Sequence, residues 1–378
     1  MKANHASLLI LVSIVFTACA SGAKKTWPLV AKPWVAAGQQ FDTEAPAKMG
    51  SARVSPAAVG TRGIVVADDV VAASWGAEIL AQGGTAVDAA VATVFAMSVT
   101  RPHYAALGGG GFLLYCPKPE KLVGSPAGLR PSECQVLDFR ERAPHAATRD
   151  MYLRDGKART DLSQDGALAS GVPGLVAGFL DAHSRWGKIP RKRLLEKPIQ
   201  LARVGVPLSG VTEFAATERW KAMNSEARRI WGCAEGAQAC PAGTVVKQPD
   251  LARVLTEISD KGAPGFYRGW VAKKLTDGLQ AAGGIMTVQD LAEYQATLRV
   301  PLRGEFRGME VVTMPPPSAG GALVLQMLGF VDLADESGEF SEGFGSARSV
   351  HALGHAMRLA FSDRAEVFGD PDQVQVPV

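Results

Sequence analysis

The sequence is poor in the residues that build metal and redox centres. It has five cysteines and six histidines among 378 residues, and no two cysteines have the C-x-x-C spacing of a zinc or redox motif. His351 and His355 are four residues apart, a spacing that can hold a metal on one helix face, but no Glu lies between them. We therefore expect a structural or surface histidine pair, with no metal and no other cofactor.

An excess of charge of one sign is also missing. The chain has 40 basic and 37 acidic residues, a net charge of +3, and no basic block is interleaved with aromatic residues. Nothing in the charge pattern therefore indicates a nucleic-acid partner.

No hydrophobic run is long enough to span a bilayer, but the N-terminus has the features of a bacterial secretory signal. Lys2 precedes the apolar run Leu8–Phe16, which has nine residues where a membrane span needs about 20. "FTAC" then resembles a lipoprotein processing box, in which Cys19 is lipidated, although Phe16 stands where Leu is usual. An ordinary signal peptide is the alternative. Both interpretations predict a signal at residues 1–18 and an exported, periplasmic protein, with Cys19 as a candidate lipid anchor.

Export provides an oxidising compartment for the other four cysteines. Cys116 and Cys134 lie at the open ends of two predicted strands, and Cys233 and Cys240 bracket the short segment "CAEGAQAC". The spacing favours two local disulfides, with four unpaired thiols as the alternative.

The pattern along the chain changes near residue 59. Residues 19–58 predict a linker or N-terminal arm, because Pro, Ala, Gly and Lys are scattered there without a sustained period. Residues 59–378 mix helical and strand patterns without strict βαβ alternation, which predicts an α+β domain. We expect strands at 64–67, 112–115, 135–140 and from 301, and helices at 70–82, 85–99, 266–282, from near Ala322 and at 346–366.

The segment "YAALGGGGFLLY" contains four consecutive glycines, Gly108–Gly111. A phosphate-binding loop has its glycines after a strand and before a helix, whose N-terminus holds the anion. Here a predicted helix precedes the glycines and a predicted strand follows them. We therefore expect glycine to permit positive φ angles and a close approach of two backbones.

Several segments together resemble the γ-glutamyltransferase (γ-glutamyltranspeptidase) family. They are "GGTAVDAAVATVFAMSVTRPHYAALGGGGFLLY", "LDFRERAPHAATRDMY", "SGVPGLVAGFLDAH", "FYRGWVAKKL", "GGIMTVQDLAEYQA", "PLRGEFRGMEVVTMPPPSAGG" and "RLAFSDRAEVFGDPD". The resemblance runs from about residue 59 to the last residue. It implies the αββα four-layer sandwich of N-terminal-nucleophile hydrolases, shared between a large and a small chain cut from one precursor and incomplete in these residues.

The resemblance also implies a mechanism. The N-terminal Thr of the small chain attacks a γ-glutamyl carbonyl, and water or an amino-acid or peptide acceptor then releases the acyl group. In the family's "DFRE" motif the substrate-binding residue falls on Arg140, whose planar guanidinium suits the α-carboxylate of a γ-glutamyl substrate such as glutathione. Asp138 and Glu141 are weaker candidates for orienting Arg140.

The family's Thr-[Thr/Ser]-His signature does not occur in these 378 residues. We therefore expect no catalytic residue here, a nucleophile beyond residue 378, and a large-chain portion that is inactive and poorly soluble without its small chain. The alternatives are a truncated or non-catalytic exported lipoprotein that keeps the scaffold as a binding module, and a cephalosporin-type acylase.

Overall fold

The computed structural model describes residues 60–61, 63–117, 133–233, 238–343 and 345–378. The chain divides into two units. Among the described residues, those within 114–136 and 299–378 belong to unit 1, and those within 60–113 and 137–298 belong to unit 2. The predicted signal at 1–18, the lipidation candidate Cys19 and almost all of the arm at 19–58 lie outside the described residues.

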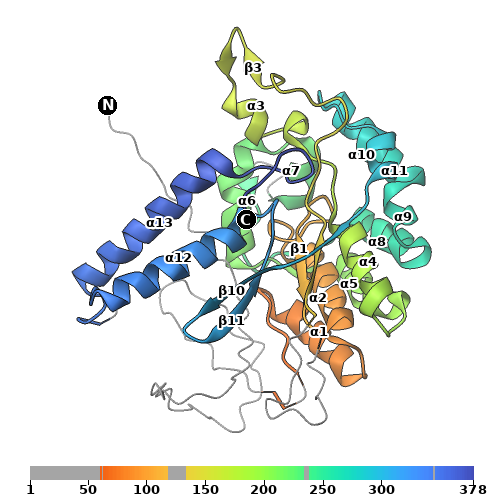
Figure 1. The fold of residues 1–378 in the computed structure, drawn as a ribbon. Coiled ribbons are helices and arrows are strands. Elements are labelled where there is room, and N and C mark those ends of the chain that lie inside the picture. Colours follow the sequence, from red (N-terminus) through yellow and green to blue (C-terminus); the bar gives the residue numbers. More distant parts are fainter. Residues whose placement is uncertain (1–59, 62, 118–132, 234–237, 344) are drawn as a thin grey trace. The chain divides into compact units, whose positions relative to one another are not determined.

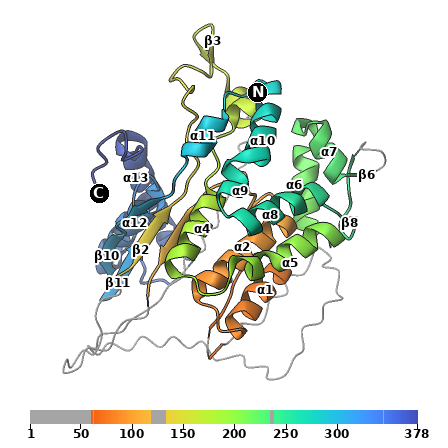
Figure 2. The same cartoon turned by 90° about the vertical axis from the view of Figure 1, so that its right-hand side faces the viewer.

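Unit 2 begins with two adjacent apolar helices, α1 (Val70–Ala81) and α2 (Ala86–Thr100) (Figure 2). Each begins at a side-chain cap: the Asp69 carboxylate accepts the Ala72 N–H at 3.0 Å, and Thr85 forms a capping box with Asp88. Most of α2 is buried, as its apolar sequence predicts for a helix packed on several sides.

Three longer helices build the rest of this core. α5 (Arg191–Val204) packs against both α2 and α8 (Pro249–Lys261), and α4 (Leu175–Trp186) packs against α2. The other helices of unit 2 are α3 (Thr160–Gln164), α6 (Gly210–Arg219), α7 (Ser225–Trp231), α9 (Pro264–Tyr267), α10 (Gly269–Ala281) and α11 (Val288–Glu293).

Short strands complete the α+β architecture. β1 (Phe112–Tyr115), β2 (Gln135–Asp138) and β9 (Thr297–Arg299) form a sheet in the order β1-β2-β9, and the division between the units falls within these three strands. The remaining strands of unit 2 pair in twos: β3 (Leu153–Arg154) with β4 (Lys157–Ala158), β5 (Val206–Pro207) with β8 (Val245–Val246), and β6 (Gly232–Cys233) with β7 (Gln238–Ala239). The mixture of helices and strands confirms the predicted class.

Unit 1 contains a hairpin and two long helices. β10 (Leu302–Phe306) and β11 (Met309–Thr313) pair antiparallel around Arg307 and Gly308, which both have positive φ, as a two-residue hairpin turn requires. α12 (Ala319–Glu336) and α13 (Ala347–Val367) lie side by side (Figure 1).

Two disulfides join cysteines that are close in sequence. Cys116 is bonded to Cys134 within unit 1, and Cys233 is bonded to Cys240 within unit 2. Cys240 is buried with Leu208 and Val246, so the second bond is part of a small apolar cluster. These are the two local pairs that the spacing favours.

Some elements differ from the sequence prediction. Residues 64–67 are not in a strand: Ile64 and Val66 are exposed, and no described strand pairs with them. The single helix expected at 266–282 is two, because Arg268 is extended and Gly269 has a φ of +68°. The single strand expected from 301 is the β10–β11 hairpin, whose Arg-Gly turn lacks the usual Asn or Asp.

No helix in the described ranges is long and apolar enough to cross a membrane.

Glycine 178 in α4 has a packing role that a matched substitution tests. A Cβ atom there would lie 2.0 Å from the ring of the buried Phe139, whereas a Cβ at the exposed Gly278 of α10 would meet no atom within 4 Å. We expect Gly178→Ala to lower the free energy of unfolding by about 1–3 kcal/mol through overpacking. Gly278→Ala should raise it by about 0.5–1 kcal/mol. Urea unfolding of both variants checks this, and equal effects of the two substitutions would contradict it.

Candidate functional site

Arg140, the predicted binding residue, lies directly after β2 on a short irregular segment. We call residues Phe139–Arg142 the Arg140 loop. The loop enters from the buried end of β2, where Leu137, Asp138 and Phe139 are all buried, and Arg140 itself is exposed.

The backbone of the Arg140 loop is fixed by hydrogen bonds to two neighbouring segments. The Phe139 N–H and C=O both pair with Gly111, at 3.0 and 3.2 Å, and those of Arg142 both pair with Val172, at 3.1 and 2.7 Å. Between these pairs, the Arg140 N–H donates to the Asp138 carboxylate at 3.0 Å and the Arg140 C=O accepts from the Tyr294 hydroxyl at 2.7 Å. The loop is therefore held on both sides of Arg140.

The side chains of the loop have different roles. The Arg142 guanidinium donates to the Thr297 hydroxyl at 2.9 Å and lies over the Tyr294 ring, 5.5 Å from its centre. The Arg140 guanidinium has no hydrogen bond or ion pair to any residue that the structure describes. Asp138 accepts from the backbone of Arg140, so its effect on Arg140 acts through the main chain. An exposed, uncommitted guanidinium on a fixed backbone is suited to a carboxylate ligand.

Three of the four glycines, Gly109–Gly111, lie against the same loop. A Cβ on Gly110 would lie 2.6 Å from the Phe139 oxygen and 2.7 Å from the Glu141 nitrogen, so only glycine fits there. The Gly109 oxygen accepts from both Gly174 and Leu175 at 2.9 Å. The expected close approach is thus present, but the expected positive φ is wrong: none of Gly108–Gly111 has one. The segment runs from α2 into β1, so no helix N-terminus follows the glycines.

His145, just after the loop, anchors the next segment to α11. Its backbone N–H and its ring Nδ1 lie 2.7 and 2.6 Å from one oxygen of the buried Asp290, which also caps α11 through Thr287. Burial works to raise the pKa of Asp290, but the hydrogen bonds from His145 and Thr287 outweigh it, so this pKa is lowered.

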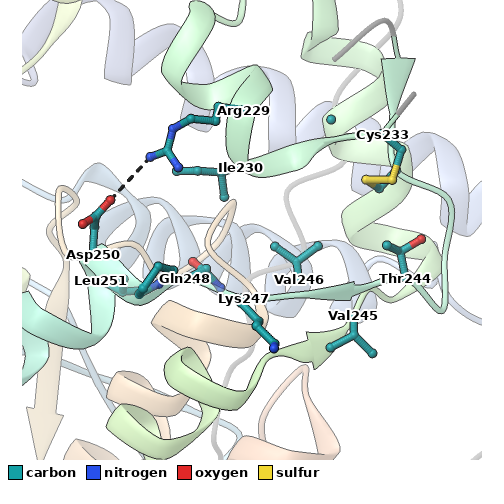
Figure 3. Close-up of a pocket in the computed structure, with 13 residues that line it drawn as sticks. Arg229, Ile230, Cys233, Thr244, Val245, Val246, Lys247, Gln248, Asp250 and Leu251 are labelled. Carbon is teal, nitrogen blue, oxygen red and sulfur yellow. Dashed lines mark hydrogen bonds and ion pairs between the residues drawn. A yellow bond between two sulfur atoms is a disulfide. The ribbon is translucent and has the colours of Figure 1, made fainter. Parts of the chain in front are cut away.

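A pocket of about 280 Å³ lies in another part of unit 2, between the Cys233–Cys240 disulfide and the start of α8 (Figure 3). Arg229 and Asp250 face each other on its wall, 3.4 Å apart, and Val246 contributes apolar surface. The pocket includes none of the residues of the Arg140 loop.

The remaining candidates do not form a further centre. The rings of His351 and His355 are 4.7 Å apart on α13, and the Arg358 guanidinium lies 3.2 Å from His355 Nδ1. Across the described residues, no group of three or more His, Cys, Asp or Glu side chains could hold a metal ion.

The Arg140 loop and the segments that hold it lie within a long stretch of the sequence that matches a known family. Residues 72–378 match the family described as gamma-glutamyltranspeptidase. The chain belongs to this family. It is 37% identical over 324 residues to the glutathione hydrolase proenzyme of Escherichia coli, covering 84% of this chain and 52% of that protein. It is 35% identical over 328 residues to the acylase ACY 1 proenzyme of a Pseudomonas strain, covering 85% of this chain and 56% of that protein.

The fold agrees with the family. The crystal structure of Helicobacter pylori gamma-glutamyltranspeptidase superposes with a TM-score of 0.77 at 34% identity, covering 85% of this chain and 88% of that one. The α+β fold of this family, expected from the sequence, is thereby confirmed. The chain spans about half the length of the curated relatives it matches.

Sequence reasoning missed two tyrosines beside the site. Tyr294 bonds the Arg140 loop directly, and Tyr267 stacks on Tyr294 with ring centres 5.7 Å apart. Both lie in segments that carry the family resemblance, "FYRGWVAKKL" and "DLAEYQA". Neither tyrosine stands in a pattern of reactive residues, so the sequence offered no chemical reason to single them out.

The lowered pKa of Asp290 predicts an acid-sensitive anchor. A carboxyl whose pKa is lower in the folded state stabilises the fold fully above its unfolded pKa of about 3.9, and this stabilisation is lost as the pH falls through the folded pKa. We expect Asp290→Asn to lower the free energy of unfolding at pH 7 by about 1–3 kcal/mol and to weaken its dependence on pH in the acid range.

Asp277→Asn is the matched control, because Asp277 is exposed and its ion-pair partner among the described residues is Lys273, one turn away. Urea unfolding from pH 7 to pH 3 measures both variants. If Asp290→Asn loses stability on acidification as steeply as the unsubstituted protein, Asp290 is not this anchor.

Proposed function

We propose that this chain is the large-chain portion of a γ-glutamyltransferase that acts as a glutathione hydrolase. The full protein would cleave γ-glutamyl amide bonds and pass the γ-glutamyl group to water or to an amino acid or peptide. The observation that carries the proposal is the exposed Arg140 guanidinium, free of partners in the described structure, on a loop whose backbone is fixed. Membership of the gamma-glutamyltranspeptidase family supports it.

Arg140 supplies recognition in this proposal. A guanidinium donates two parallel hydrogen bonds to a carboxylate, so it sets both the position and the plane of the α-carboxylate of a γ-glutamyl group. With one end of the substrate held, the γ-carbonyl several bonds away is presented at a defined place. The fixed backbone matters because movement of the loop would displace that carbonyl.

The chemical step needs a nucleophile, which the family resemblance assigns to the N-terminal Thr of a small chain from the same precursor. Its hydroxyl oxygen bonds to the γ-carbonyl carbon, the amine leaves with a proton, and an ester to the enzyme remains. Water or an acceptor amine then takes the acyl group and restores the hydroxyl. The relatives in Escherichia coli and Pseudomonas are named as proenzymes, which supports a precursor of this kind.

The exposed apolar surface of α13 supports the proposal of a partner chain. Val350, Met357 and Phe361 recur on one face of the helix at i, i+7 and i+11, and their exposed fractions are 58%, 51% and 49%. A row of exposed apolar side chains of this kind is typical of a surface that another chain covers. We assign the small chain as that partner.

An acylase with another amide substrate is the second candidate, because the identity to the acylase ACY 1 proenzyme is 35%. An acylase substrate without an α-amino acid end gives Arg140 no α-carboxylate to bind. A non-catalytic exported lipoprotein that keeps the scaffold is the third, and it predicts binding without turnover. Hydrolysis of γ-glutamyl anilides, glutaryl amides and cephalosporin amides by the full-length protein separates the three.

We also propose export to the periplasm, with Cys19 as a candidate lipid attachment site. The signal-like N-terminus and the two disulfides support this location.

Substitution of Arg140 tests recognition in the full-length, processed protein. A lysine keeps the charge but loses the planar pair of donors, so we expect Arg140→Lys to raise KM for a γ-glutamyl anilide by about 10- to 100-fold. Arg149→Lys is the control, since Arg149 is 97% exposed and pairs only weakly with Asp150 at 3.9 Å. Steady-state kinetics measures both. A KM for Arg140→Lys within 2-fold of the control would overturn the assignment of Arg140.

A further inference from the structure

The hydroxyl of Tyr294 makes a single directed contact to the main chain of the site. It donates to the Arg140 carbonyl oxygen at 2.7 Å, across 154 residues of sequence. The side chain is otherwise buried, with only 8% of the residue exposed. This bond holds the peptide group that directly follows the Arg140 side chain.

The ring of Tyr294 is itself held in place. It stacks almost parallel on the Tyr267 ring, with an angle of 8° between the planes. Tyr267 is fixed in turn by its hydroxyl, which donates to the Pro173 oxygen at 2.9 Å and accepts the Ala177 N–H of α4 at 3.1 Å. The Arg142 guanidinium also lies over the Tyr294 ring, 5.5 Å from its centre.

Space for the Tyr294 hydroxyl exists because residue 174 is glycine. A Cβ at Gly174 would lie 2.1 Å from that hydroxyl oxygen and 2.0 Å from the Phe139 oxygen. The sequence "SGVPG" therefore leaves room at the point where the tyrosine reaches the Arg140 loop. The contact is built by the packing of three separate segments.

We propose that Tyr294 is a positioning residue for substrate recognition: its hydroxyl fixes the Arg140 peptide and thereby sets where the guanidinium meets the α-carboxylate. This inference rests on the proposed function of Arg140. In this role Tyr294 acts through Arg140, because its hydroxyl donates its proton to the Arg140 backbone carbonyl.

The protonation state of Tyr294 suits this role. Burial raises the pKa of Tyr294, and burial also raises the pKa of Tyr267, so both hydroxyls remain donors throughout the neutral and mildly alkaline range. The contact is thus a constant feature of the site and not a pH-dependent one.

Removal of the hydroxyl alone tests the proposal in the full-length, processed protein. Tyr294→Phe keeps the ring stack and loses one hydrogen bond, so we expect KM for a γ-glutamyl anilide to rise about 2- to 12-fold with kcat within 2-fold. Tyr152→Phe is the matched control, because the Tyr152 hydroxyl also donates to a backbone oxygen, that of Leu168 at 3.2 Å, outside the site. Tyr152→Phe should leave KM unchanged.

A second measurement separates positioning from a general loss of structure. The same variants are assayed with the substrate analogue whose α-carboxylate is replaced by a carboxamide, and Tyr294→Phe is also made in an Arg140→Ala background. We expect the KM effect of Tyr294→Phe to disappear in both cases, because the guanidinium–carboxylate contact is then absent. Site-specific 3-fluorotyrosine at position 294, which keeps the hydroxyl, should restore KM to within 2-fold.

The outcomes distinguish the two proposals. If Arg140→Ala raises KM and Tyr294→Phe does not, or if Tyr294→Phe raises KM as much with the carboxamide as with the carboxylate, the positioning role is wrong and the function of Arg140 stands. If Arg140→Ala itself leaves KM unchanged, the proposed function of Arg140 fails first.

Discussion

The pairing of the Arg140 loop with its neighbours is the constraint on which the rest of the site depends. The guanidinium of an arginine stands at the end of a long, flexible side chain, so its position depends on how well the backbone is fixed. Here Phe139 pairs with Gly111 and Arg142 pairs with Val172, while Asp138 and Tyr294 satisfy the two polar groups of Arg140 between them. Because these hydrogen bonds pair the backbone groups of the loop, the side chain of Arg140 can bind a ligand.

This constraint explains why motifs without reactive groups belong to the site. Gly110 and Gly174 are positions where a Cβ would collide with the main chain of the loop, at 2.6 and 2.0 Å from the Phe139 oxygen. Gly178 leaves the ring of Phe139 the same kind of room one turn into α4. Glycine is required by close packing at these positions, and this packing in turn fixes the backbone that carries Arg140.

The sequence predicted what local chemistry determines. The apolar periods predicted helices at 70–82 and 85–99, within a few residues of α1 and α2, and cysteine spacing favoured the two local disulfides. The features that the sequence did not predict depend on contacts between residues far apart in the chain. Residues 64–67 read as a strand because Ile and Val favour one, but a strand exists only where a partner pairs with it. Tyr294 carried no signal because its role depends on a contact 154 residues away.

The most direct test of this account is a crystal structure of the full-length, processed protein with L-glutamate bound. The account predicts both oxygens of the α-carboxylate within hydrogen-bond distance of the Arg140 guanidinium, with the Tyr294 hydroxyl still bonded to the Arg140 carbonyl. A glutamate whose α-carboxylate is held by other residues, with Arg140 facing solvent, would contradict it.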